Sequence, residues 1–327
     1  MHQGKMKPII LAAFMAMLVT ACGGTGNKPA EQSAHETTPL HPRFDGDSAF
    51  ALIVEQCDMG ARVPGTVAHE RCVKWLMTTL SPLADTVIEQ QAPVTTFDGV
   101  HLTAHNVIAV FNPAATSRLL LLAHYDCRPR ADADPDTSRH REPVMGANDA
   151  ASGTAILVQL ARTMSSQRPD RGIDLLFVDV EDWGNSGATD AEDTWALGTR
   201  YWATHPHVPG YKPAYAILLD MVGARGATFM REQYSEIYSS GIVDHVWRIA
   251  SNERATCFIN RIGGGVTDDH VPLLEAGITA IDIIDQRPGS EHGFFPEWHT
   301  TGDTPDVIDP TVLEQVGNTL LAVIYSR

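Results

Sequence analysis

The chain has 327 residues, of which 43% are hydrophobic and 20% are charged, and these fractions are close to the averages of globular proteins. It carries 24 Lys and Arg against 40 Asp and Glu, which gives a formal net charge of −16. Because a surface of this charge repels polyanions, we expect no nucleic-acid partner. Five Cys in a chain of this length also exclude a small scaffold built on disulfides.

Residues 1–21 have the pattern of a secretory signal peptide. Two Lys precede an apolar run over residues 9–19, which is too short to cross a bilayer because a spanning helix needs about 20 residues. The run ends in Val-Thr-Ala-Cys, a tetrad that resembles the lipobox of bacterial lipoproteins. We therefore expect lipidation of Cys22 and an exported protein, anchored to a membrane on the periplasmic side through its lipid alone. An ordinary signal peptide followed by a chance Cys is the alternative.

Residues 22–43 contain almost no large apolar side chain, so they cannot bury a core and we expect a flexible tether. No second linker follows, and residues 44–327 are therefore expected to form a single catalytic domain. Within this domain, Cys57 and Cys72 are near enough in sequence to form a disulfide in an oxidising compartment. Buried free thiols are equally consistent with their spacing.

Helical patterns alternate with short apolar runs through the rest of the chain. Helices are expected at residues 48–58, 66–80, 151–166, 196–204, 234–251 and 310–325. Nearly continuous apolar runs, typical of strands that are buried on both faces, lie at residues 106–111, 118–123, 173–180, 215–222 and 278–284. The alternation predicts an α/β fold, a three-layer α/β/α sandwich with a central mixed, mostly parallel β-sheet.

Residues 128–147 form a charged stretch that contains Pro and lacks periodicity. A loop of this length inside a compact domain is unusual and often functional. A plain surface excursion is the alternative interpretation.

Three of the predicted strands end in residues that can bind a metal. One leads into His124, the next into Glu181 and Asp182, and a third into Asp220. Ligands of open α/β sheets collect outside the carboxyl ends of the strands. A His and several carboxylates at that edge predict a metal site, with zinc the natural candidate for mixed nitrogen and oxygen ligands.

Two further motifs accompany these strand ends. Asp149 lies in GANDAASG just before a predicted helix, and His299 follows Trp298 in the loop PEWHTT. Each residue alone has an ordinary explanation, since an Asp before a helix is usually an N-cap and a loop His is usually solvated. Their occurrence together with the strand-end residues favours a common site.

The order of HYD, NDAASG, ED, LLDM and a late His resembles that of the co-catalytic zinc aminopeptidase superfamily. Within it, GARVPGT near residue 60, TDDHVPLLEAGI at 267–278 and FPEWHTTGDT at 295–304 resemble the glutaminyl cyclases of animal type and their bacterial branch. These enzymes form pyroglutamate from an N-terminal Gln and release ammonia. The resemblance implies a zinc aminopeptidase-like fold and peptide or protein substrates that begin with Gln.

Carried over residue by residue, the resemblance implies one zinc per chain, with Asp149, Asp182 and His299 as its ligands. Animal cyclases usually have Glu at the position of Asp182. Because Asp is one methylene shorter, the chain must approach the metal more closely there. This departure is the one associated with the bacterial branch.

The same resemblance implies that Glu181 is the catalytic acid and base and that Asp220 and Asp268 are its acidic hydrogen-bonding partners. Trp195 and Trp298 are expected to be walls of the substrate pocket. Two other side chains compete with the first of these, Trp183 and Trp202. No role follows for Asp282, which stands where animal cyclases have a further residue of the network.

Two other functions remain open on the same residues. In a di-zinc aminopeptidase, His124 and Asp220 would bind a second zinc, Asp149 would bridge the metals and Glu181 would activate water. A surface lipoprotein could instead use an inactive peptidase fold to bind peptides, since a fold does not determine a function.

Overall fold

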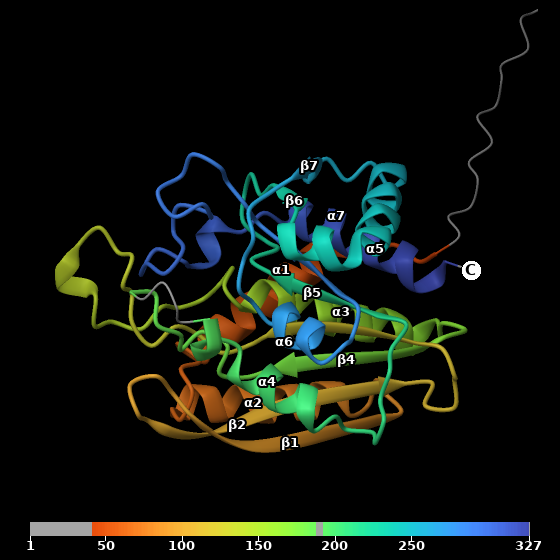
Figure 1. The fold of residues 1–327 in the computed structure, drawn as a ribbon, viewed down its shortest axis with the longest axis horizontal. Helices are drawn as coiled ribbons and strands as arrows, with labels where there is room; N and C mark the ends of the chain where they lie inside the picture. Colours follow the sequence, from red (N-terminus) through yellow and green to blue (C-terminus); the bar gives the residue numbers. More distant parts are fainter. Residues whose placement is uncertain (1–40, 188–191, 327) are drawn as a thin grey trace, which may run out of the picture. The chain divides into compact units, whose positions relative to one another are not determined.

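The computed structural model describes residues 41–187 and 192–326. At the centre of this described part lies a six-stranded sheet, in the order β1-β2-β4-β3-β5-β8 (Figure 1). The strands are β1 (Thr86–Thr95), β2 (His101–Phe111), β3 (Arg118–His124), β4 (Gly172–Val178), β5 (Tyr215–Asp220) and β8 (Ala280–Ile284). Strands β1, β2 and β4 pair antiparallel, whereas β4, β3, β5 and β8 run parallel. The predicted mixed, mostly parallel sheet is confirmed.

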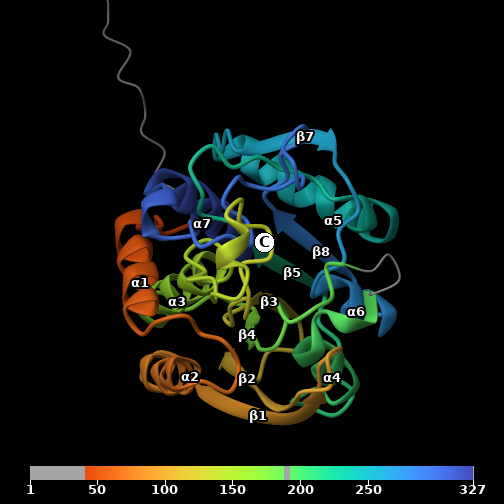
Figure 2. The same cartoon turned by 90° about the vertical axis from the view of Figure 1, so that its left-hand side faces the viewer.

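Helices cover both faces of this sheet (Figure 2). One face carries α1 (Gly46–Asp58), α2 (Val67–Leu80), α3 (Ala151–Ser166), α5 (Gln233–Asn252) and α7 (Pro310–Tyr325). The other carries α4 (Leu197–Thr204) and α6 (His270–Glu275). Short elements complete the described part, the paired strands β6 (Phe229–Arg231) and β7 (Phe258–Ile262) and 3-10 turns at Thr137–Arg139, Glu192–Thr194 and Pro305–Val307. The predicted three-layer sandwich is confirmed.

The central strand β3 shows why its sequence is apolar throughout. Leu119 and Leu121 belong to the core on the side of the sheet that α3 covers, whereas Leu120 and Leu122 belong to the core on the other side, which also holds Trp202 of α4 and Leu273 of α6. All four side chains are fully buried. Because successive residues of a strand point to opposite faces, a strand with helices on both sides needs an apolar residue at every position.

Local sequence signals account for the start of three of the predicted helices, α1, α2 and α7. The Asp45 side chain accepts a hydrogen bond from the backbone N–H of Ser48 at the start of α1, and Thr66 and Asp309 cap α2 and α7 in the same way.

Strand β1 was not predicted from the sequence. Apart from the buried Ala92, its residues are exposed or half-buried at the edge of the sheet, and they give no continuous apolar run.

The predicted strands at 173–180 and 215–222 extend too far. Strand β4 ends at Val178 and β5 at Asp220. Shortly after each strand the backbone turns through the left-handed region, at Val180 with φ 53° and at Met221 with φ 51°. The chain therefore leaves the sheet before Glu181 and Asp182 after β4, and directly after Asp220 at the end of β5.

The predicted signal peptide, Cys22 and all of the tether except residues 41–43 lie outside the described residues. Within 41–187 and 192–326, every helix is too short or too polar to cross a bilayer. The described Cys residues are buried and free, so Cys57 and Cys72 are not joined by a disulfide.

Gly153 lies where α3 packs tightly against β3 and β5 of the sheet, and it provides a test of this packing. A Cβ at this position would lie 2.5 Å from the Leu219 carbonyl oxygen and 2.9 Å from the Ala123 Cβ. We predict that Gly153→Ala lowers the free energy of unfolding by about 1–3 kcal/mol, because the helix must shift outward. The measurement is denaturant unfolding of both proteins.

Gly241→Ala in α5 is the matched control, since a Cβ there meets nothing within 4 Å. This change should leave stability unchanged or raise it by up to about 1 kcal/mol, because Ala favours the helix. Equal stability of the Gly153→Ala variant and the unmodified protein would contradict the close packing of α3.

Candidate active site

The parallel strands β3, β4 and β5 bring the predicted site residues to one edge of the sheet. His124 and Asp220 are the last residues of β3 and β5, and Asp182 lies four residues beyond the end of β4. Asp149 precedes α3, and His299 comes from the long connection between β8 and α7. Side chains that are distant in sequence therefore meet where open α/β sheets bind ligands.

Asp149, Asp182 and His299 form a first group that can hold a metal. One ligand atom from each lies within 4.8 Å of the others, and all three side chains are buried. His299 Nε2 lies 3.2 Å from Asp182 Oδ1 and 3.8 Å from Asp149 Oδ2. Asp182 Oδ2 is buried without a hydrogen-bond partner. A cation would satisfy this oxygen, and two carboxylates with one imidazole form a donor set that suits zinc.

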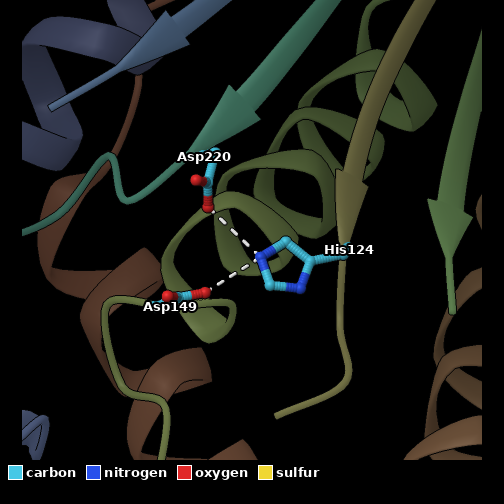
Figure 3. Close-up of side chains that lie close together, drawn as sticks. All are labelled: His124, Asp149 and Asp220. Atoms are coloured by element: carbon cyan, nitrogen blue, oxygen red, sulfur yellow. Dashed lines mark hydrogen bonds and ion pairs between the residues drawn. The ribbon is translucent and has the colours of Figure 1, made fainter. Parts of the chain in front are cut away.

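His124, Asp149 and Asp220 form a second group of the same kind (Figure 3). His124 Nε2 lies 3.0 Å from Asp149 Oδ1 and 3.2 Å from Asp220 Oδ1. Figure 3 shows the imidazole extending from β3 toward both carboxylates. Asp149 thus belongs to both groups, and the ligand geometry alone admits one metal or two.

A cavity of about 160 Å³ opens beside the first metal group. Its walls include every site residue expected from the sequence except Cys22: Asp149, Glu181, Asp182, Trp195, Asp220, Asp268, Trp298 and His299. Five further lining residues had not been anticipated: Met221, Val266, Thr267, Ile284 and Phe294. The structure therefore brings the expected residues together, while their individual roles remain predictions.

The competing Trp residues lie elsewhere in the structure. Trp202 is fully buried in the core on the α4 side of the sheet, and Trp183 donates its Nε1–H to Asp98 at 3.1 Å. Neither is among the residues that line the cavity. Trp195 faces His299 with its ring nearly parallel to the imidazole and the ring centres 6.2 Å apart, which favours it as the pocket wall.

The carboxyl groups of the cavity carry raised pKa values. Burial raises the pKa of Glu181 well above its usual value, against the attraction of His124, and the negative charge of Asp268 adds to the rise. Burial and the charge of Asp149 raise the pKa of Asp220 to about 6. Burial and the charge of Asp220 raise the pKa of Asp268 to about 7. These raised pKa values favour the protonated forms of the cluster, and perturbed pKa values of this kind are typical of groups that transfer protons.

Two residues that were not singled out from the sequence fix the loop of Asp149. Asp303 accepts hydrogen bonds from the backbone N–H groups of Asn148 at 2.8 Å and Asp149 at 3.1 Å. Arg62 is fully buried and donates to the carbonyl oxygens of Met145 and Gly146. Both residues lie in the motifs GARVPGT and FPEWHTTGDT, so their motifs carried the signal although the residues were not named.

Residues 106–324 match the model of peptidase family M28, and the chain belongs to this family. It is 44% identical to a Zn-dependent exopeptidase from Parabacteroides distasonis, with a TM-score of 0.85 over 88% of this chain and 99% of that one. It is 43% identical to the glutaminyl cyclase of Tannerella forsythia, with a TM-score of 0.85 over 88% of this chain and 100% of that one.

The chain is also 26% identical over 296 residues to the glutaminyl-peptide cyclotransferase of Bos taurus, covering 79% of this chain and 76% of the bovine protein. The resemblance to the bacterial branch of the glutaminyl cyclases and the expectation of zinc are both confirmed.

Glu181 and Asp182 both line the cavity, but only Asp182 belongs to a metal group. We predict that Asp182→Asn lowers zinc affinity at least about tenfold, because a neutral amide is a weaker ligand than a carboxylate. Glu181→Gln should retain zinc. The measurement is the zinc content of both variants after dialysis against a chelator. If Glu181→Gln instead loses zinc while Asp182→Asn retains it, Glu181 is the metal ligand and the prediction is wrong.

Proposed function

We propose that the chain is a glutaminyl-peptide cyclotransferase, which converts an N-terminal Gln of peptides and proteins into pyroglutamate with release of ammonia. The observation that carries the proposal is the cavity beside Asp149, Asp182 and His299. It combines a metal group with further buried carboxyl groups and with Trp side chains. Similarity to solved bacterial glutaminyl cyclases supports it.

The substrate brings both reacting groups, its α-amine and its γ-carboxamide. Ring closure is intramolecular, so the protein has mainly to hold a conformer in which the amine faces the carbonyl carbon. Asp149, Asp182 and His299 would hold zinc, which when bound polarises the γ-carbonyl group. A free α-amine has a pKa of about 7.7–8.0 and is largely protonated at neutral pH, and the acidic cavity attracts that cation.

In the proposed mechanism Glu181, which lines the cavity, transfers the protons. The α-amine reacts in its neutral form, after its ammonium proton has passed to solvent. Glu181 accepts the second proton, which the amine nitrogen loses as the new N–C bond forms, and donates it to the amide nitrogen as the C–N bond breaks and ammonia leaves. Asp220 and Asp268 line the same cavity, and their charges hold the shared proton within the cluster. The reaction consumes no water.

The apolar walls of the cavity serve to keep water out. Trp298 packs against Phe294, with ring centres 5.0 Å apart, and its ring lies over the imidazole of His299. Trp195 also lines the cavity, with its ring nearly parallel to the same imidazole. Water at the γ-carbonyl carbon would hydrolyse Gln to Glu, so a dry wall favours ring closure.

A di-zinc aminopeptidase is the second candidate function. It is favoured by the group of His124, Asp149 and Asp220, whose ligand atoms lie within 4.8 Å of one another. In that enzyme Asp149 would bridge two metals and Glu181 would activate a water molecule. The two functions predict different metal contents and different products.

A single experiment separates these functions. Purified protein is incubated with a Gln-initiated peptide, and we predict that the peptide loses the mass of one ammonia while its sequence stays intact. The preparation should contain about one zinc per chain, and chelation should abolish turnover because the site loses its cation. Two tightly bound zinc ions together with release of free Gln would establish the peptidase. A peptide whose mass does not change at all would favour a binding protein.

The role of Glu181 has its own test. We predict that Glu181→Gln lowers kcat on the Gln peptide by a factor on the order of 10² or more, because an amide cannot accept the proton of the amine. Zinc content and thermal stability should stay unchanged. Trp183→Phe is the control, since Trp183 lies outside the cavity lining. Full activity of Glu181→Gln would show that another group carries the proton.

We also propose that the protein is exported and anchored by a lipid on Cys22, on the periplasmic side of a membrane. The lipobox-like tetrad and the polar segment that follows it support this proposal.

The anchor can be tested in cell fractions. We predict that Cys22→Ala moves the protein from the membrane fraction to the soluble one, because a buried acyl chain supplies the membrane affinity. Cys257→Ala is the control, since this buried thiol belongs to the folded domain. Sedimentation of the Cys22→Ala variant with membranes would contradict lipidation at that residue.

A further inference from the structure

The loop of residues 128–147, which the proposed mechanism does not use, begins with a buried cation. Arg128 is 1% exposed, and its guanidinium is held by several acceptors. Nε and Nη2 donate to the two carboxylate oxygens of Asp132 at 2.8 and 2.6 Å. Nη1 lies 3.2 Å from both Asp182 Oδ1 and the Asp182 carbonyl oxygen. One guanidinium thus contacts a predicted metal ligand directly.

Asp132 extends this contact to a second ligand. Its Oδ1 lies 3.5 Å from Nδ1 of His299, while Nε2 of the same ring faces Asp182 at 3.2 Å. A carboxylate beside Nδ1 favours the tautomer with the proton on Nδ1, which leaves the lone pair of Nε2 free for a metal. Arg128 in turn fixes Asp132 through two parallel hydrogen bonds, the geometry that a guanidinium forms with a carboxylate.

The same guanidinium also supports the pocket wall. Its central carbon lies 5.0 Å from the ring centre of Trp195, within the range of a cation–π contact. Trp195 in turn faces His299, and a Cβ added at Gly184 would overlap the Trp195 ring. Arg128 and the Gly184 backbone therefore both restrict the position of this ring.

We propose that Arg128, acting with Asp132, is a positioning residue of the metal site. It fixes Asp182, which follows β4, relative to His299, which lies in the connection before α7, and it keeps Trp195 over the pocket. The proposal rests on the proposed metal-binding roles of Asp182 and His299. An ion pair that merely ties the loop to the domain would leave zinc affinity unchanged, and this difference is what an experiment must measure.

The experiment compares Arg128→Met, Arg128→Lys and Asp132→Asn with the unmodified protein. Apoprotein is titrated with zinc against a competing chelator of known affinity. We expect zinc binding to weaken about 10–100-fold in Arg128→Met and Asp132→Asn, the range found when groups that orient metal ligands are removed. Arg128→Lys should not restore the affinity, because an ammonium group cannot reproduce the two parallel hydrogen bonds.

Arg139→Met is the matched control. Arg139 lies in the same loop, its side chain is 44% exposed, and its ion-pair partner is Glu142 at 3.4 Å. Its removal should leave zinc affinity within about twofold. With zinc at saturation, the Arg128 variants should raise KM for a Gln peptide more than they lower kcat, because Trp195 loses a contact while Glu181 is untouched.

The outcomes distinguish the proposal from the assignment on which it rests. If Arg128→Met and Asp132→Asn bind zinc as tightly as the unmodified protein while Asp182→Asn loses it, the ligand assignment stands and the positioning role is wrong. If Asp182→Asn retains zinc, Asp182 is not a ligand, and both the ligand assignment and the positioning role of Arg128 are wrong. Should Arg128→Met fail to fold, Asp132→Asn decides, since the Asp132 side chain is 24% exposed and its replacement keeps the same shape.

Discussion

The crowding of negative charge at one edge of the sheet is the constraint on which the site depends. Five carboxyl groups line a single cavity of about 160 Å³: Asp149, Glu181, Asp182, Asp220 and Asp268. Carboxyl groups that share one small buried cavity cannot all be ionised unless cations lie close to them. The imidazoles of His124 and His299 and the guanidinium of Arg128 lie beside these carboxyl groups. Ligand atoms of the same site are also close enough together to bind a metal cation. Burial and neighbouring negative charge also raise the pKa values of Glu181 and Asp268, which favours their neutral, protonated forms.

The layered fold could be predicted because its signals are local. Buried strands such as β3 need apolar residues throughout, and the helix caps at Asp45 and Thr66 are visible in the sequence. Strand β1 could not be predicted, because an edge strand with one exposed face lacks that pattern. The sequence also could not show where β4 ends, since Val180 adopts a left-handed backbone conformation that a β-branched residue rarely takes.

The residues of the candidate site could be found from motifs and strand ends. The side chains that hold these residues in position could not. Asp149, Asp182 and His299 stand in short recognisable motifs. Arg128 was noticed only as part of a charged loop, because its contact with Asp182 joins residues 54 positions apart in sequence. No local pattern encodes such a contact. The end of β4 before Glu181 also explains why neighbouring Glu181 and Asp182 both reach the cavity, although adjacent residues within a strand face opposite sides.

Asp149 lies at the intersection of two ligand sets, and this has a consequence for how such a site can change. Its Oδ1 faces His124 and its Oδ2 faces His299, so the two halves of the site share one carboxylate. Neither half can be dismantled at Asp149 without disturbing the other. Proteins with this site could therefore change their chemistry without replacing any ligand residue. A change in how strongly His124 and Asp220 bind a second cation would be enough.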